Sequence, residues 1–243
     1  MTVTKWSRRP SVQFRRRREV LRVLRAADEL DVVFQPIVDL NKLACVGYEA
    51  LARFPDGRPP DLWFAEARAV GLEKLLEMAA LWRAVETFSL RGSLSVNLSP
   101  ATAVSREFAD FVRRCPTGID LTIELTEHAA VADYPTLVHA LAPMRHAGVQ
   151  VAVDDAGSGV SSMRHVLAIE PDIIKLDCSL VSGIDVDSRR QALAGSLEQF
   201  AEQVGAVVLA EGIERHEEWE TCQDLGIPLG QGFYFGRPCP LPA

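Results

Sequence analysis

The chain has 243 residues, 48% of them hydrophobic, which allows one large domain or two small ones with a full core. The sequence contains no apolar run long enough to span a bilayer and no stretch typical of a signal peptide, so we expect a cytoplasmic protein. The five cysteines form no CxxC pair and the five histidines form no HxH or HxxxH cluster. This pattern argues against a disulfide framework and against a zinc site.

The formal net charge of −7 is unevenly distributed along the chain. Residues 1–30 contain nine Lys or Arg and three acidic residues, a net charge of +6, which leaves −13 on the remainder. An acidic body argues against bulk nucleic-acid binding, although bound divalent cations can reverse the local sign at a carboxylate-rich site. We predict a basic, partly helical extension over 1–30 and one domain over 31–243. We expect the basic helix to pack on that domain, and the alternative is contact with nucleic acid, an anionic membrane or a protein partner.

Apolar patterns along the chain alternate between those of strands and those of helices. In chain order, the expected elements are a basic helix at 14–30, strands at 32–38 and 46–53, a helical stretch at 60–88 divided at Gly71, a strand at 94–99, a helix at 107–115, a strand at 121–127, a helix at 134–146, a strand at 149–155, a short helix after Ser162, a strand at 173–176, a helix at 188–204, a strand at 206–210, a helix at 217–225 and a last strand at 230–235. Eight strands alternating with helices in a chain of this size predict an α/β fold, a TIM-like (β/α)8 barrel.

Two adjacent carboxylates, Asp154 and Asp155, follow an apolar run at 151–153 and precede a glycine-rich turn. A strand covered on both faces is a nearly continuous apolar run, so this segment is expected to deliver both acids to the end of a buried strand. Adjacent carboxylates at such a point suit a divalent metal or a pair of metals. Taken alone, an Asp-Asp-x-Gly sequence is also compatible with a surface turn.

Other apolar segments also end in acids or amides, and one contains a lysine. An ionised group within a buried strand is rare unless it is paired or functional. Because the carboxyl ends of barrel strands form the active face, we expect these side chains to converge there: Glu49, Asn97, Glu124, Asp154, Asp155, Lys175, Glu211 and Gln231. Oxygen ligands without histidine or thiolate select Mg²⁺ or Mn²⁺. Two ions ~4 Å apart suit phosphodiester hydrolysis.

Seven motifs resemble, in order and spacing, the EAL domain of bacterial cyclic di-GMP phosphodiesterases, and the resemblance covers residues 32–238. They are Glu49-Ala50-Leu51, Asn97-Leu98-Ser99, Glu124-Leu125-Thr126-Glu127, Asp154-Asp155, Lys175-Leu176-Asp177, Ala210-Glu211-Gly212-Ile213-Glu214 and Gln231-Gly232-Phe233-Tyr234-Phe235. The resemblance implies a TIM-like barrel, a homodimer, and hydrolysis of cyclic di-GMP to linear pGpG with two Mg²⁺ or Mn²⁺ ions.

The resemblance also implies a role for each matched residue. Glu49, Asn97, Glu124 and Asp154 resemble ligands of one metal, with Asp154 shared, and Asp155 resembles a ligand of the second. Lys175 matches the catalytic lysine that orients or helps to deprotonate the attacking water. The remaining residues resemble substrate contacts or groups around the metals, namely Gln35, Arg53, Glu211 and Gln231, with Glu127 supporting a loop and Glu214 lying outside the ligands.

The chain departs from the usual family pattern without losing a metal ligand. The segment after Asp155 has Ala156, Ser158 and Val160 where the family usually has Phe, Thr and Tyr, which predicts a more mobile loop and slower turnover. Arg68 and Cys178 replace a usual acid and a usual basic residue. Two functions therefore remain open: an active phosphodiesterase, or a cyclic di-GMP receptor or protein-interaction module with weak or no turnover.

Overall fold

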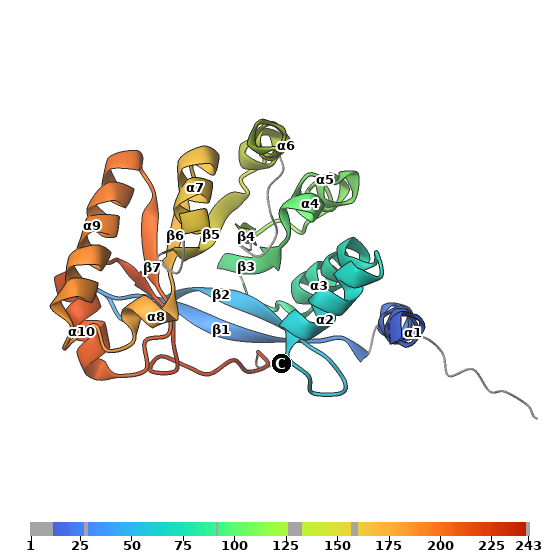
Figure 1. Cartoon of the computed structure of the whole chain (residues 1–243), viewed down its shortest axis with the longest axis horizontal. Coiled ribbons are helices and arrows are strands. Elements are labelled where there is room, and N and C mark those ends of the chain that lie inside the picture. The colour runs from blue at the N-terminus through green and yellow to red at the C-terminus, as the bar shows by residue number, and fades with distance from the viewer. Residues whose placement is uncertain (1–11, 27–28, 91, 126–132, 157–159, 242–243) are drawn as a thin grey trace, which may run out of the picture.

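The computed structural model describes residues 12–26, 29–90, 92–125, 133–156 and 160–241. These residues form eight strands that close into a barrel in chain order, from β1 to β8, with helices around it (Figure 1). The strands are β1 (Asp31–Asp39), β2 (Ala44–Arg53), β3 (Gly92–Leu98), β4 (Ile119–Leu125), β5 (Gln150–Ala156), β6 (Ile173–Leu176), β7 (Val207–Ala210) and β8 (Leu229–Gly230). The predicted TIM-like α/β barrel is confirmed.

Most helices follow the strands as the sequence predicts. They are α1 (Val12–Arg25), α2 (Pro60–Ala69), α3 (Glu73–Thr87), α4 (Pro100–Ala103), α5 (Arg106–Val112), α6 (Tyr134–His146), α7 (Val160–Ile169), α8 (Cys178–Val181), α9 (Ser188–Val204) and α10 (His216–Asp224). The short helices α4 and α8 were not predicted. Each begins after a side chain that accepts a hydrogen bond from the backbone of the first turn, Ser99 for α4 and Asp177 for α8. In the part of the chain that the structure describes, no helix is long and apolar enough to cross a membrane.

The first strand runs in the opposite direction to the one that a regular (β/α)8 barrel would give it. β1 pairs antiparallel with both β2 and β8, and the other neighbouring pairs are parallel. Only residues 40–43 join β1 to β2, and a parallel connection needs a crossover of a dozen or more residues. The hairpin places Gln35 directly opposite Glu49 in the β1–β2 register.

The last strand is shorter than the predicted 230–235, because β8 ends at Gly230. Beyond it the chain folds onto the segment after β7, where Ile213 N donates to Gln231 O at 3.1 Å and Tyr234 N donates to Ile213 O at 3.0 Å. A Cβ at Gly232 would lie 2.0 Å from the carbonyl oxygen of Ile213, so only glycine allows this approach. The turn therefore leaves the sheet directly beside Gln231.

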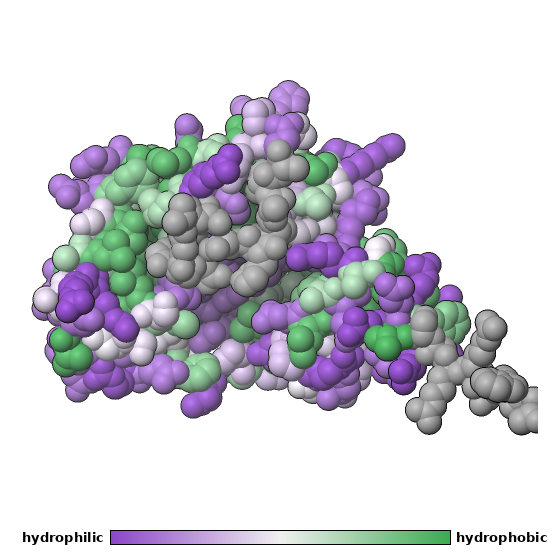
Figure 2. Space-filling view, in the orientation of Figure 1, coloured by the Kyte–Doolittle hydropathy of each residue, from purple (hydrophilic) through white to green (hydrophobic). Residues whose placement is uncertain are grey.

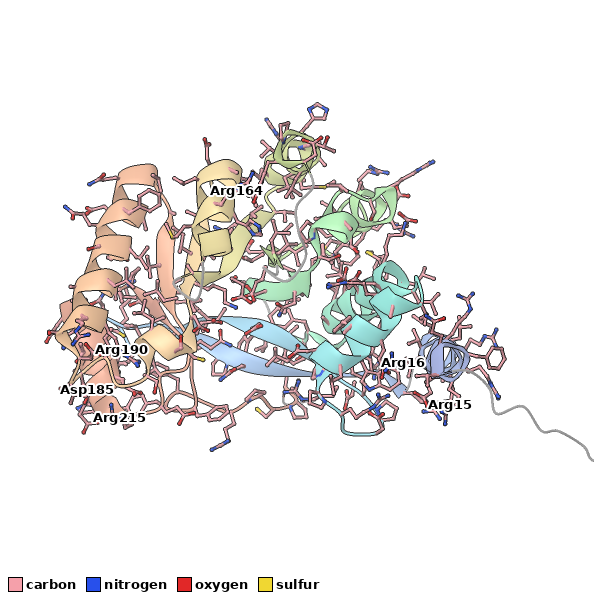
Figure 3. The ribbon with its side chains drawn as sticks, in the orientation of Figure 1. Arg15, Arg16, Arg164, Asp185, Arg190 and Arg215 are labelled. Atoms are coloured by element: carbon pink, nitrogen blue, oxygen red, sulfur yellow. The ribbon has the colours of Figure 1, made fainter. Side chains whose placement is uncertain are left out.

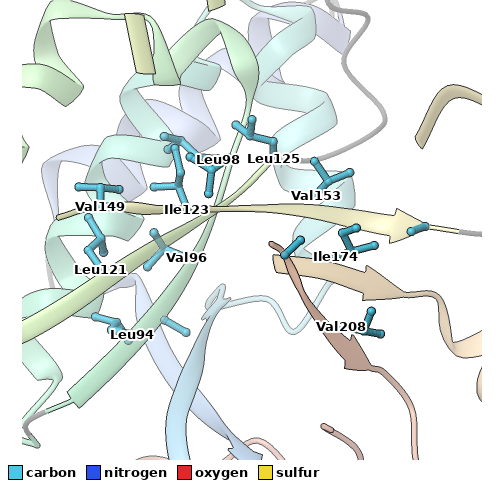
Figure 4. Packing of buried hydrophobic residues seen from close by; sticks show 14 of the residues in the cluster. Leu94, Val96, Leu98, Leu121, Ile123, Leu125, Val149, Val153, Ile174 and Val208 are labelled. Carbon is cyan, nitrogen blue, oxygen red and sulfur yellow. The ribbon is translucent and has the colours of Figure 1, made fainter. Parts of the chain in front are cut away.

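Apolar side chains of the strands pack between the barrel and its helices (Figure 4). Figure 4 labels Leu94, Val96, Leu98, Leu121, Ile123, Leu125, Val149, Val153, Ile174 and Val208. Successive residues of a strand point to opposite faces, so the residues between these on β3 and β4 face the barrel interior. They include Asn97 and Glu124, which are direct neighbours in the β3–β4 register.

The basic helix α1 packs on α2 and α3, as expected, at the right-hand edge of Figure 1. Its Val20 and Val23 are buried in a second hydrophobic cluster with Trp63 and Leu76. An ion pair of 3.3 Å joins Arg16 to Glu66 on α2. The proposed boundary between residues 30 and 31 stays a prediction, although this packing joins α1 to the helical layer of the barrel.

Residues 157–159 and the side chains of Val160 and Ser162 lie outside the described residues, so the predicted mobility of this loop stays a prediction. Ala156 is the last residue of β5 and is fully buried. Its carbonyl oxygen accepts a hydrogen bond from Asp177 N at 3.2 Å. A larger side chain at position 156 would therefore enter a buried environment.

Candidate active site

Lys175 lies at the centre of the polar side chains that the strand ends bring together. It is 1% exposed on β6, and its Nζ atom lies 2.5 Å from Oε2 of Glu124 and 2.7 Å from Oε1 of Glu211. The same atom lies 3.2 Å from Oδ1 of Asp154 and 4.0 Å from Oε1 of Glu49. One ammonium is thus shared among four carboxylates from β2, β4, β5 and the end of β7.

Amide side chains hold the carboxylate of Glu49 from both sides. Asn97 Nδ2 donates to Oε1 at 2.8 Å, and Gln231 Nε2 donates to Oε2 at 2.6 Å. Gln231 Nε2 also donates to Gln35 Oε1 at 3.0 Å, and Gln35 Nε2 donates to Gly236 O at 3.1 Å. These hydrogen bonds fix the orientation of the Gln35 amide and of the Glu49 carboxylate.

The electrostatics of the site follow from its burial. Burial raises the pKa of Glu124 well above its ordinary value, and the nearby Glu49 adds to the effect. Burial lowers the pKa of Lys175, but the carboxylates, Glu124 first, outweigh it and hold that pKa above its ordinary value. Burial also raises the pKa of Glu211 to about 8, although Lys175 opposes the shift. These raised pKa values reflect the burial of several carboxylates around one ammonium, so a divalent cation in the site would stabilise the ionised forms of Glu124 and Glu211.

The oxygen atoms available in the site fit a hard divalent cation. Within the site, three buried side-chain oxygens have no hydrogen-bond partner among the described residues, namely Glu124 Oε1, Asp154 Oδ1 and Gln231 Oε1. Asp154 Oδ1 is within 3.2 Å of the lysine ammonium, but not in hydrogen-bonding geometry. Carboxylate and amide oxygens are the donors that Mg²⁺ and Mn²⁺ prefer. Lys175 lies between these acids, and within the described ranges no three Asp, Glu, His or Cys side chains are already arranged around a metal position.

Some predicted site residues lie away from this cluster. Arg53 ends β2 and donates from Nη1 to Ala52 O at 2.9 Å. Glu214 is exposed and lines a small cavity beside Glu211. Glu127 and the side chain of Asp155 lie outside the described residues, although the backbone of Asp155 continues β5 beside Asp154.

Two cavities border the cluster and share Leu51 in their walls. The larger, of about 710 Å³, lies between the β1–β3 strands and the helices α2 and α3, and it reaches Asn97, Asp154 and Arg53. The smaller, of about 240 Å³, is lined by Gln35, Glu49, Glu211, Glu214 and Gln231 together with Cys178 and Phe233. The cluster therefore borders a space of the size that small-molecule sites occupy.

The larger cavity wall also contains charged helix residues that were not predicted as site residues, among them Arg68 and Glu77. Arg68 on α2 pairs with Glu73 at 2.6 Å, and Glu77 on α3 is buried. Both stand on helices, where the strand-end pattern does not apply. The only signal for Glu77 in the sequence is a carboxylate on an otherwise apolar helix face.

A separate group of charged residues stabilises α8, the short helix that follows β6. Figure 3 shows Asp185, Arg190 and Arg215 near one another beside α8 and α10. Arg215 pairs with Asp185 and, at 3.1 Å, with Glu218, and Arg190 Nη1 donates to Ser179 O at 2.5 Å. This group lies outside both cavities, so we assign it to the support of α8. Figure 3 places Arg15 and Arg16 of α1 at the other end of the molecule.

These observations define an α/β barrel whose strand ends carry a buried, carboxylate-rich site. A family model described as the EAL domain matches residues 17–238, so the chain belongs to the EAL domain family.

Relatives include proteins named as enzymes of cyclic di-GMP. The chain is 29% identical over 227 residues to the cyclic di-GMP phosphodiesterase PA2567 of Pseudomonas aeruginosa, covering 85% of this chain and 38% of the relative. It is 31% identical over 232 residues to the uncharacterized protein y4lL of Sinorhizobium fredii, covering 90% of this chain and 28% of the relative. The chain thus spans less than two fifths of the length of these relatives.

Solved structures give the same fold. The manganese and cyclic di-GMP complex of Klebsiella pneumoniae BlrP1 is 30% identical with a TM-score of 0.76, covering 87% of this chain and 56% of that chain. An EAL domain protein of Listeria monocytogenes has a TM-score of 0.80 and covers 92% of this chain and 94% of that chain. At 22% identity, the second likeness shows the fold alone.

Proposed function

We propose that this chain is a divalent-metal-dependent phosphodiesterase that hydrolyses cyclic di-GMP to linear pGpG and so lowers the level of this second messenger. The observation that supports it most is the buried group of four carboxylates around Lys175 at the strand ends. The family, the relative named a cyclic di-GMP phosphodiesterase and the manganese complex of BlrP1 support the same reaction.

Each side chain has a role in this proposal. Glu49, Asn97, Glu124 and Asp154 would hold one Mg²⁺ or Mn²⁺ ion, and Asp155 would contribute to holding a second. When bound, the two ions neutralise charge on the phosphodiester and lower the pKa of a bound water. Gln231 and Asn97 fix the carboxylate of Glu49, which each contacts directly.

Lys175 acts on the reacting water in the same proposal. Its ammonium has three N–H donors. The carboxylates of Glu124 and Glu211 hold it in place, at 2.5 and 2.7 Å from Nζ. The lysine therefore orients the attacking water and stabilises the negative charge that develops on the phosphodiester oxygens as the water attacks. Glu211, which contacts the same ammonium, would hold the second metal or its waters, and Glu214 lies beside it in the wall of the smaller cavity.

The two cavities support a substrate with two bases joined by phosphates. One base would enter the larger cavity, of about 710 Å³, and the other the smaller, of about 240 Å³. The phosphates would then cross the cluster between them. Arg53 stands in the wall of the larger cavity, where a guanidinium can contact a phosphate oxygen or a base edge, and Gln35 takes the corresponding place in the smaller one.

The proposal is tested by incubating the purified chain with cyclic di-GMP and separating the nucleotides by chromatography. With Mg²⁺ or Mn²⁺ we expect pGpG as the product. With Ca²⁺ we expect little product, because the looser and longer coordination of Ca²⁺ does not hold two ions at the required separation. Saturable binding of cyclic di-GMP without any product would instead identify the chain as a receptor, and absence of both would contradict the proposal.

A homodimer and a cytoplasmic location belong to the same proposal. The apolar side chains of Leu167 on α7 and Leu193 on α9 are exposed, and we propose that a second copy covers them. Figure 2 shows hydrophobic residues at the left of the molecule, where Figure 1 places α9. The molar mass of the intact chain by light scattering tests the dimer, and the mass of a monomer would contradict it.

A further inference from the structure

The carboxylate of Glu77 connects helix α3 to the turn that follows Asn97. Its Oε2 accepts a hydrogen bond from Ser99 Oγ at 2.8 Å, and its Oε1 accepts one from Ser99 N at 3.2 Å. Ser99 Oγ in turn accepts from Thr102 N at 3.3 Å and so begins α4. All three side chains are buried. One helical carboxylate therefore holds both the backbone and the side chain of a residue two positions after Asn97.

A buried carboxylate is a costly way to fix a turn. Burial raises the pKa of Glu77, and hydrogen bonds from Thr102 and Ser99 oppose the shift. An apolar side chain at this helix position would avoid the cost of desolvating a charge. The turn also has a cap of its own, since Ser99 Oγ accepts a hydrogen bond from Thr102 N at the start of α4. The contact therefore needs an explanation beyond the formation of α4.

The position of Asn97 supplies that explanation. Asn97 is the penultimate residue of β3 and lies beside Glu124 in the register of the sheet, and its Nδ2 atom donates to Glu49 Oε1 at 2.8 Å. Any shift of the β3 end would move this amide relative to both carboxylates. Glu77 contacts that end through Ser99, and Glu77, Asn97 and Asp154 all line the larger cavity.

We infer that Glu77 is a positioning residue of the metal site, which acts through Ser99 to hold Asn97 in the geometry that binds a divalent cation. This inference rests on the proposed function and adds to it a residue that lies on a helix, outside the strand-end motifs. Groups that orient metal ligands without touching the metal commonly change metal affinity by about ten- to a hundredfold when they are removed.

The test uses the intact chain with Mn²⁺ alone as the probe, in two measurements. Calorimetry gives the dissociation constant of Mn²⁺, and hydrogen exchange with mass spectrometry gives the protection of peptides that cover 97–104. We expect Glu77→Leu to raise the dissociation constant about tenfold and to lose protection in this segment. Glu77→Gln retains one oxygen that can accept from Ser99, so we expect an intermediate result.

The control is Glu198→Gln on α9, which removes the charge of a partly buried carboxylate. Burial raises the pKa of Glu198, as it does for Glu77. It should leave both measurements unchanged. If Glu77→Leu does not fold, Ser99→Ala tests the same link from the other side and should raise the dissociation constant by a smaller factor. Unchanged Mn²⁺ affinity in the folded variants would overturn the inference, even if protection is lost. Mn²⁺ affinity that shifts as expected in a chain without turnover would support the inference while the proposed function fails.

Discussion

At the scale of single residues, Lys175 is a buried cation in contact with several carboxylates. Its Nζ is the cation that the carboxylates of Glu124, Glu211 and Asp154 contact within 3.2 Å. Removing one partner of a buried ion pair leaves uncompensated charge and typically costs 3–5 kcal/mol. The same lysine therefore contributes to stability as well as to the proposed reaction.

We predict that Lys175→Met lowers the melting temperature in the presence of EDTA, by roughly 6–12 °C for about 3 kcal/mol in a chain of this size. A divalent cation that binds the folded state should restore part of the loss, because it replaces the missing positive charge. Thermal unfolding with EDTA and with Mn²⁺ measures both effects.

The control for this prediction is Lys74→Met, which removes an exposed lysine paired with Glu107 at 2.8 Å. Exposed pairs contribute about 0–1 kcal/mol, so its melting temperature should change little. A melting temperature of Lys175→Met equal to that of the unmodified chain would contradict the assignment of Lys175 as the counter-charge of the site.

At the scale of elements, the turn after β8 places Gln231 against Glu49. The turn closes on the segment after β7, and a Cβ at Gly232 would lie 2.0 Å from Ile213 O and 2.3 Å from Ile213 N. We predict that Gly232→Ala displaces this turn. The variant should be less stable by about 1–3 kcal/mol. Its turnover should also fall, because the displaced Gln231 no longer donates a hydrogen bond to the carboxylate of Glu49.

Gly195→Ala on α9 is the matched control. The nearest atom to a Cβ there is Leu225 Cδ2 at 3.6 Å, which is ordinary contact. Alanine favours a helix over glycine by about 1 kcal/mol, so this variant should melt at an equal or higher temperature with unchanged turnover. The account of the turn fails if both variants show the same melting temperature and the same rate.

At the scale of the whole molecule, the sequence predicts the barrel well because its strands have strong apolar patterns. Eight strands were expected and eight are found among the described residues. The direction of β1 was not predicted, since a strand pattern carries no direction and only the four-residue connection at 40–43 indicates a hairpin. The predicted end of β8 was wrong because the aromatic residues at 233–235 have a high strand propensity. Their conformation depends instead on the backbone hydrogen bonds with Ile213.

The candidate site was predicted in part for the same physical reason. Acids at strand ends meet because the fold brings these ends together, and the structure places Glu49, Glu124, Asp154 and Glu211 around Lys175. Glu77 could not be predicted in this way. Its partner Ser99 is 22 residues away, and the contact depends on how α3 packs across β3.

The central claim is that the carboxylates around Lys175 form a metal site for phosphodiester hydrolysis. The most direct measurement is the rate of pGpG formation from cyclic di-GMP against Mg²⁺ concentration, in the unmodified chain and in Glu49→Ala. We predict a rate that rises with Mg²⁺ to a plateau in the unmodified chain and falls by more than about a hundredfold in Glu49→Ala, which loses a ligand of the cation that stabilises the transition state. An unmodified rate in a folded Glu49→Ala protein, or a rate independent of Mg²⁺ and Mn²⁺ after treatment with EDTA, would contradict the claim.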